Sequence, residues 1–189
     1  QEMEDAKDKV LMGAERKSMI MTLEEKKLTA YHESGHAIVS LHLKDTDPIH
    51  KATIIPRGMA LGLVMHLPER DQLSLTKAQL VARLAVAMGG RIAEEMIFGP
   101  SKVTTGAQSD ISMATNDAKR MVTQWGMSQK LGPIAYGENE QEIFLGHSVT
   151  QKKSVSEKTA QEIDQEVRRI VIEAQKKARL ILKKNVKQL

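Results

Sequence analysis

The stretch that decides the fold is residues 22–41, which read TLEEKKLTAYHESGHAIVSL. Thr22 is followed three residues later by Glu25, and this spacing is typical of a capping box. In such a box a hydroxyl and a carboxylate satisfy the free backbone N–H groups at a helix start. Apolar residues then recur at helical spacing to about residue 43. We therefore predict one helix from residue 23 to about residue 43.

Within this helix, residues 32–36 read His-Glu-Ser-Gly-His and match the pattern His-Glu-x-x-His. Residues four apart share one face of a helix, so His32 and His36 can bind one zinc ion together. Glu33 points about 100° away from His32, which keeps it out of the ligand set but close to a zinc-bound water. A carboxylate there can take the proton of the water as it attacks a carbonyl. The alternative is a surface helix with two unrelated histidines.

A catalytic zinc site needs a third protein ligand, and the sequence offers several candidates. His42 follows the motif by six residues, but Val39 stands where extended zincin motifs have glycine, which disfavours it. Glu94 and Glu95 lie in an apolar helical stretch, and Asp110 lies at a predicted helix start, where the helix dipole favours its charged form. Each carboxylate also has a structural alternative, as the partner of a nearby arginine or as a helix cap. Spacing alone leaves the aspartate and the glutamates about equal.

The remaining pattern predicts a mainly α fold with a small β element and a C-terminal helical region. Paired glycines in the middle of the most apolar helix allow close packing against a neighbouring element. We expect helices over residues 3–12, 75–98, 109 or 110 to about 125, and from 154 onward, with strands at 52–55 and 61–67 and a further short strand at 142–145.

Composition excludes several classes of site. The 189-residue chain has no cysteine, which rules out disulfides, thiol nucleophiles, iron–sulfur clusters and cysteine-ligated zinc. Its net charge of +4 is mild and neither requires nor excludes an anionic partner. Residues 176–187 hold six basic residues and no acidic one, which we interpret as the solvated face of a helix and not as a nucleic-acid site. No apolar run is long enough to span a bilayer, and no signal peptide opens the chain.

Six stretches resemble the proteolytic domain of the FtsH-type ATP-dependent zinc metalloproteases, a family of membrane-bound AAA+ proteases. They follow the family order over nearly the whole chain: MGAERKSMIM (12–21), LTAYHESGHAIVSL (28–41), IIPRGMALG (54–62), GGRIAEEMIFG (89–99), VTTGAQSDISMATNDAKRMVTQWGMSQKLGP (103–133) and FLGHS (144–148). Ser34 stands where the family usually has alanine, a small change that should not disturb a metal.

The resemblance implies roles for individual residues. His32, His36 and Asp110 match the family's zinc ligands, with one Zn²⁺ per chain, and Glu33 matches its catalytic glutamate. Glu94 and Glu95 then match groups that orient a ligating histidine or serve the structure. On this resemblance, residues 1–153 form a zinc peptidase core, and residues 154–189 are a C-terminal helical segment of the same domain.

The resemblance also implies a larger protein. The family forms homo-hexamers that degrade unfolded and membrane proteins with the help of ATP. No phosphate-binding Gly-x-x-x-x-Gly-Lys-Ser/Thr motif occurs here, so we expect the ATPase and a membrane anchor to precede Gln1. We expect the full protein in the bacterial inner membrane with this domain on the cytoplasmic side, this fragment to be soluble, and no nucleic-acid partner.

Two alternatives remain open at this point. Residues 60–67 could offer a sheet edge to which an extended substrate adds through main-chain hydrogen bonds, or they could be an ordinary core hairpin. The chain could also be a catalytically silent scaffold for a ring. A silent scaffold usually has a damaged motif, whereas Glu33 and the candidate ligands are all present here.

Overall fold

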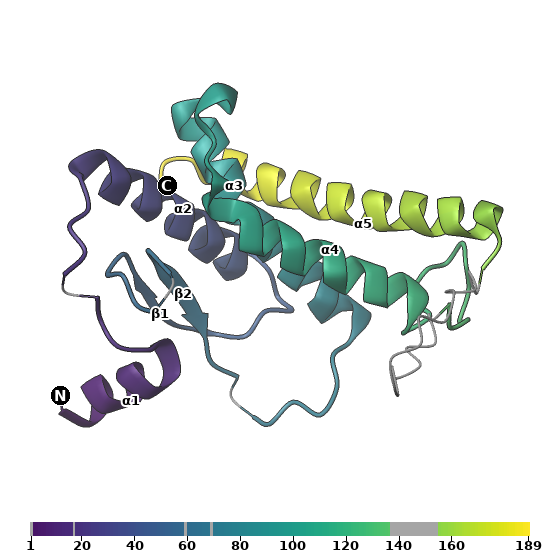
Figure 1. The fold of residues 1–189 in the computed structure, drawn as a ribbon, viewed down its shortest axis with the longest axis horizontal. Coiled ribbons are helices and arrows are strands. Elements are labelled where there is room, and N and C mark those ends of the chain that lie inside the picture. Colours follow the sequence, from purple (N-terminus) through teal and green to yellow (C-terminus); the bar gives the residue numbers. More distant parts are fainter. Residues whose placement is uncertain (1, 17, 59, 69, 137–154) are drawn as a thin grey trace, which may run out of the picture.

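The computed structural model describes residues 2–16, 18–58, 60–68, 70–136 and 155–189, and it confirms a mainly α fold with a small two-stranded sheet (Figure 1). The strand expected at residues 142–145 lies outside the described residues. The elements are α1 (Glu2–Met12), α2 (Leu23–Leu41), β1 (Ile49–Thr53), β2 (Leu63–His66), α3 (Lys77–Phe98), two 3₁₀ turns η1 (Pro100–Lys102) and η2 (Thr105–Ala107), α4 (Gln108–Thr123) and α5 (Glu157–Lys184).

Helix α3 is the centre of the fold, because α2, α4 and α5 all pack against it. Its apolar residues point in nearly every direction, which is typical of a buried helix, and Leu84 and Ile92 are almost completely buried. Helices α2 and α3 approach each other closely at Gly35 and Gly89. A Cβ on Gly35 would overlap the carbonyl oxygen of Gly89, and a Cβ on Gly89 would lie 2.6 Å from that of Gly35. This crossing confirms that the glycine pair of α3 serves close helix packing.

The predicted cap at the start of α2 is present in the structure, whereas the predicted cap at the start of α4 is not. Thr22 and Glu25 form the predicted capping box at the start of α2, with Thr22 N donating to Glu25 Oε2 over 2.8 Å. The prediction that Ser109 or Asp110 caps α4 was wrong, because α4 begins at Gln108 without a side-chain cap. The preceding turn η2 runs directly into the helix, and the backbone N–H of Gln108 donates to the carbonyl oxygen of Thr105 in that turn. The carboxylate of Asp110 is therefore not used for capping.

The sheet is one antiparallel hairpin whose strands are shifted from the predicted ranges. β1 pairs with β2 from Ile49 opposite His66 to Thr53 opposite Leu63, with an irregularity near the start. The predicted strand at residues 52–55 ends early because Ile55 N donates to the Thr53 side chain over 3.0 Å and not to a neighbouring strand. The hairpin lies beside α2 (Figure 1). It thus forms a wall next to the helix that carries the His-Glu-x-x-His pattern.

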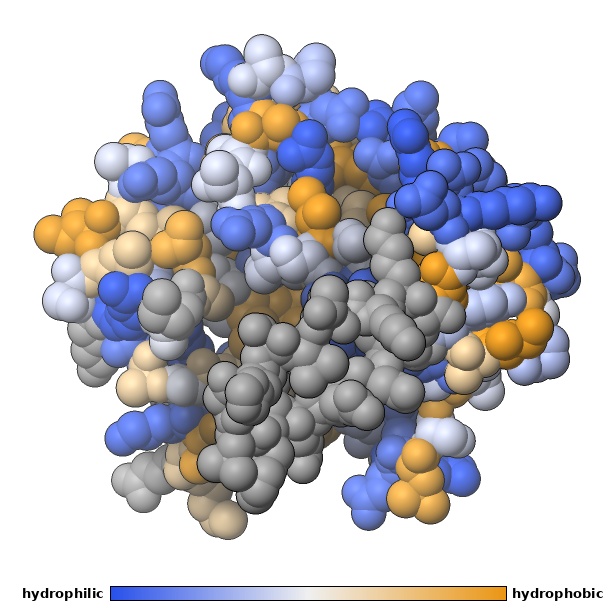
Figure 2. Space-filling model, turned by 45° about the vertical axis from the view of Figure 1, so that its right-hand side comes forward, coloured by the Kyte–Doolittle hydropathy of each residue, from blue (hydrophilic) through white to orange (hydrophobic). Residues whose placement is uncertain are grey.

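Helix α5 runs beside α3 and α4 (Figure 1) and packs against both. Its contact face is one apolar stripe. The stripe is formed by buried side chains at helical spacing: Ile163, Ile170, Ala174, Ala178 and Leu182. Within the basic run, Arg179 binds Glu95 of α3 over 2.8 Å, and the lysines are exposed. On the face seen in Figure 2, hydrophilic residues predominate along the upper edge, and hydrophobic residues form small separate groups. In the described part of the chain, no helix combines the length and apolar character that crossing a bilayer requires.

Candidate metal centre

Three side chains from two helices converge on one point. His32 and His36 extend from successive turns of α2, and their Nε2 atoms lie 3.0 Å apart. Asp110, in the first turn of α4, places Oδ2 3.3 Å from His32 Nε2 and 3.4 Å from His36 Nε2. Ligands about 2.0–2.1 Å from a tetrahedral zinc ion lie roughly 3.3–3.4 Å from one another. The three atoms are therefore close to the spacing that a shared zinc ion requires.

Hydrogen bonds on the far side of each ring aim its Nε2 atom at this point. His36 Nδ1 lies 2.7 Å from the backbone carbonyl of Val86, which can only accept, so Nδ1 carries the proton. His32 Nδ1 lies 2.6 Å from Oε1 of Glu94. Because Nδ1 keeps its proton, each ring that gives up its Nε2 proton becomes a neutral ligand whose Nε2 lone pair faces the point shared with Asp110, which is the form that binds a metal.

Glu94 connects His32 to the loop before α4. Its side chain is fully buried in α3 (0% exposed), and its second oxygen, Oε2, accepts from the backbone N–H and the hydroxyl of Thr104 at 2.8 and 3.2 Å. A buried carboxylate with these partners is satisfied on both oxygens. Because the same side chain holds His32 and the segment that leads to Asp110, it fixes two of the three candidate ligands relative to each other.

Gly90 of α3 forms the floor beneath the rings. A Cβ at this position would lie 2.5 Å from His32 Nε2 and 2.6 Å from His36 Nε2. Gly90 is not among the glycines with positive φ, so the backbone conformation does not require glycine here. The two imidazoles can meet only because this residue has no side chain.

The charges of the cluster favour a cation. Burial alone would raise the pKa of Asp110, but hydrogen bonds from His32 and His36 outweigh it and hold this pKa well below its usual range. Burial alone would lower the pKa of His32, but its bonds to Asp110 and Glu94 outweigh burial and raise the pKa. The buried carboxylate of Glu94 and the half-buried carboxylate of Asp110 thus stabilise positive charge at the imidazoles, and a divalent ion at the same point supplies that charge directly.

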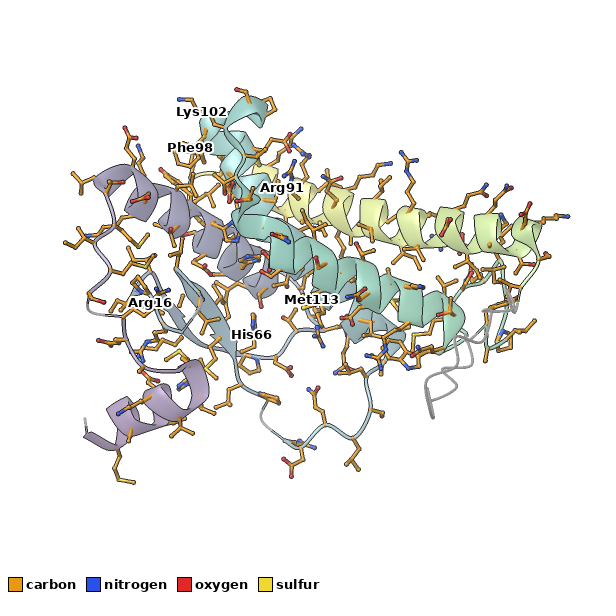
Figure 3. The ribbon with its side chains drawn as sticks, in the orientation of Figure 1. Arg16, His66, Arg91, Phe98, Lys102 and Met113 are labelled. Carbon is orange, nitrogen blue, oxygen red and sulfur yellow. The ribbon has the colours of Figure 1, made fainter. Side chains whose placement is uncertain are left out.

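The cluster opens into a large cleft of about 1060 Å³ between α2, the hairpin, α3 and α4. Glu33 lines this cleft, and burial raises the pKa of its carboxyl group. His66 at the end of β2 and Met113 on α4 line it as well, and Figure 3 shows both between the hairpin and α4. The chain therefore places a carboxylate outside the ligand set and beside it, in a space large enough for an extended peptide.

The amino-acid sequence of this chain matches a known protein family. The sequence profile described as "Peptidase family M41" matches residues 19–189. The chain belongs to peptidase family M41.

Individual relatives of this M41 chain support the assignment. It is 58% identical over its whole length to a protein of Caulobacter vibrioides, of which it covers 30%. It is 56% identical to a protein of Acidobacterium capsulatum over 98% of the chain and 28% of that protein. A protein of Rickettsia bellii is 54% identical over the whole chain and 29% of its own length. All three are named ATP-dependent zinc metalloprotease FtsH, so the resemblance seen in the sequence is confirmed. The chain spans less than a third of the length of these relatives.

The M41 chain brings some of the predicted candidates together and not others. His32, His36 and Asp110 form the one group of potential metal ligands found within the described residues. His42 turns back to the carbonyl of Ile38 at 2.9 Å, and Glu95 forms its hydrogen-bonded ion pair with Arg179, with a weaker attraction from Arg91. The contributions of Val86, Gly90 and Thr104 were not predicted. Backbone acceptors and missing side chains leave no spacing signal, although the glycine pair in the most apolar helix pointed to a close contact there.

The charge on Glu94 provides a test of this arrangement. Because an amide at this position accepts more weakly and cannot serve His32 and Thr104 equally, we expect Glu94→Gln to weaken zinc binding about 10- to 100-fold. Competition with a fluorescent zinc chelator measures the affinity. The neighbouring Glu95→Gln is the matched control, because its ion pair with Arg179 is partly exposed and remote from the rings. Equal losses in the two variants would contradict the role of Glu94.

Proposed function

We propose that this chain is the zinc endopeptidase part of an ATP-dependent, membrane-anchored protease. The observation that carries the proposal is the convergence of His32, His36 and Asp110 beside Glu33 at the wall of the cleft. Two imidazole nitrogens and one carboxylate oxygen are a donor set that suits zinc and leaves a further position open. Membership of family M41 and relatives named zinc metalloproteases support the same metal and the same class of reaction.

His32, His36 and Asp110 would hold the metal, and Glu33 would move the proton. Zinc, when bound, supplies a Lewis acid that polarises the scissile carbonyl and acidifies water. The Glu33 carboxylate accepts a proton from the attacking water as the new C–O bond forms at the carbonyl carbon. It then passes this proton to the amide nitrogen as the C–N bond breaks. Burial raises the pKa of Glu33 above its usual value, which is the direction that suits a group that must both take and return a proton.

The hairpin offers a place for the substrate backbone. Within the described residues the sheet has only two strands, and residues 60–64, next to or within β2, line the cleft. An extended peptide can add to the outer edge of β2 through main-chain hydrogen bonds, which tolerate many side chains. We propose that the substrate backbone pairs with this edge of β2, and that the hairpin is therefore more than an ordinary part of the core.

The length of the relatives supports a proposal about a larger protein, because this chain matches less than a third of each of them. We propose that the whole protein is a membrane-anchored homo-hexamer, with this domain on the cytoplasmic side of the bacterial inner membrane. It would use ATP in a part outside this chain to degrade unfolded and membrane proteins. The apolar stripe of α5 on α3 and α4 supports residues 154–189 as a helical segment of the same domain as residues 1–153.

Removal of the metal tests the proposed function. We expect the chain to cleave a quenched fluorescent peptide, to lose this activity to background with a zinc chelator, and to regain it when zinc is restored. Fluorescence measures peptide cleavage, and mass spectrometry measures the bound zinc in the same samples. Cleavage that persists without zinc would overturn the proposal. One bound zinc without any cleavage would favour the silent scaffold instead.

A further inference from the structure

Gly62, the residue before β2, touches the Glu33 side chain in a way that no other residue type allows. A Cβ at this position would lie 2.7 Å from both Cγ and Oε1 of Glu33, and 2.7 Å from Cγ2 of Thr29. Carbon atoms that are not bonded normally stay about 3.5–4.0 Å apart. Gly62 is also not among the glycines with positive φ, so alanine could adopt its backbone conformation. Glycine is therefore needed here for the space beside Glu33 and not for a turn.

We propose that Gly62 is a positioning residue for Glu33: its backbone is the wall that holds the carboxylate beside the metal ligands. This inference rests on the proposed function, because it assigns the placement of the proposed general base. Within the described residues no hydrogen bond holds the Glu33 carboxylate, and only the longer-range attraction of His32 and His36 acts on it, so rotation about its side-chain bonds must be limited by other contacts. Contact with a fixed backbone wall restricts those rotations. General-base efficiency depends on such placement, since a misplacement of about 1 Å can cost a factor of about 100 in rate.

The wall itself is firmly held. Just before Gly62, Arg57 and Ala60 exchange backbone hydrogen bonds of 3.0 and 2.9 Å that close a tight turn. The guanidinium of Arg57 then binds Glu15 Oε1 at 2.6 Å and the carbonyl of Gly13 at 3.1 Å. The turn is thus tied to the segment that follows α1. A backbone fixed at this turn can act as a rigid stop for the Glu33 carboxylate.

The same backbone has a second neighbour in the cleft. Residues 60–64 form the edge on which we propose that the peptide lies, so Gly62 would touch the substrate strand on one side and Glu33 on the other. The backbone around Gly62 would then hold both the docked peptide and the general base Glu33 in place. Distances between the attacking water, Glu33 and the scissile bond would be set by this shared element.

The Gly62→Ala substitution tests the inference when the contact with Thr29 is removed at the same time. We therefore use Thr29→Ser, which lacks Cγ2, as the reference and compare it with Thr29→Ser/Gly62→Ala, both loaded with zinc. The added methyl group meets Cγ and Oε1 of the flexible Glu33 side chain and no backbone atom among its three nearest neighbours, so we expect that side chain to move and the fold to persist. We expect kcat for a quenched peptide to fall about 100-fold, with KM within about threefold and zinc content unchanged.

A crystal structure of the double variant provides a readout that does not depend on activity. We expect the Glu33 carboxylate to be displaced by about 1 Å or more relative to the reference, with the zinc ligands in place. An undisplaced carboxylate overturns the inference. A kcat of the double variant equal to that of the reference overturns it too, as does a rise in KM without a fall in kcat. Absence of chelator-sensitive cleavage in the reference would instead refute the proposed function, whereas the position of Glu33 would still decide whether Gly62 holds it.

Discussion

Replacement of Glu33 by glutamine should lower kcat for peptide cleavage by about 10²- to 10⁴-fold, the usual contribution of a general base. Glutamine has nearly the same shape and fits beside Gly62, but its amide cannot accept a proton from water at neutral pH. The proposed metal ligands His32, His36 and Asp110 are untouched, so the variant should still bind one zinc per chain. The pairing of lost turnover with retained zinc distinguishes a proton-transfer role from a structural one.

The design of this experiment needs a control for the loss of one negative charge in the cleft. Glu24 lies on the same helix and lines the same cleft, but it is exposed and does not form the capping box at the helix start. Glu24→Gln removes an equal charge away from the metal centre and should cost far less in kcat. Zinc content, kcat and KM measured side by side complete the comparison. If Glu33→Gln cleaves as fast as Glu24→Gln, Glu33 is not the general base.

The sequence predicted the part of the site that lies on a single helix. His32, Glu33 and His36 lie within five residues of one another. Their directions are therefore fixed by helix geometry once the capping box has defined where the helix begins. Asp110 is different, because its distance from the histidines depends on how α3 crosses α2 and on how η2 leads into α4. Spacing alone therefore left it level with Glu94 and Glu95, and only the family resemblance separated them.

The errors of the sequence analysis have the same non-local origin. A residue such as Ser109 or Asp110 at a helix start usually predicts a cap, but the preceding 3₁₀ turn removed the need for one. The start of β1 at Ile49 depends on pairing with His66, which no local pattern records. The floor under the rings consists of an absent side chain, so the role of Gly90 emerged only when the helices were placed together.

Gly90→Ala should abolish zinc binding while the fold persists. The new methyl group would lie 2.5 and 2.6 Å from the Nε2 atoms of His32 and His36, so the rings must separate. Moving the rings apart strains the hydrogen bonds of their Nδ1 atoms to Glu94 and to the carbonyl of Val86. The Nε2 atoms therefore have no other low-energy position from which they could bind one metal ion. Alanine favours a helix over glycine by about 1 kcal/mol, so α3 itself should not be weakened. We expect zinc content near zero and peptide cleavage at the level of the chelated protein.

Gly89→Ala is the matched control, because it places the same methyl group one residue earlier, against backbone instead of imidazole. Its Cβ would lie 2.6 Å from the carbonyl oxygen of Gly35, and neither backbone can move without separating α2 from α3. We expect this variant to lower the free energy of unfolding of the zinc-free protein by about 1–3 kcal/mol, as overpacked cores do. Gly90→Ala should leave that free energy close to the wild-type value. Denaturant unfolding in chelator, together with zinc analysis, separates the two effects, and a Gly90→Ala protein that binds zinc normally would show that the rings do not depend on this floor.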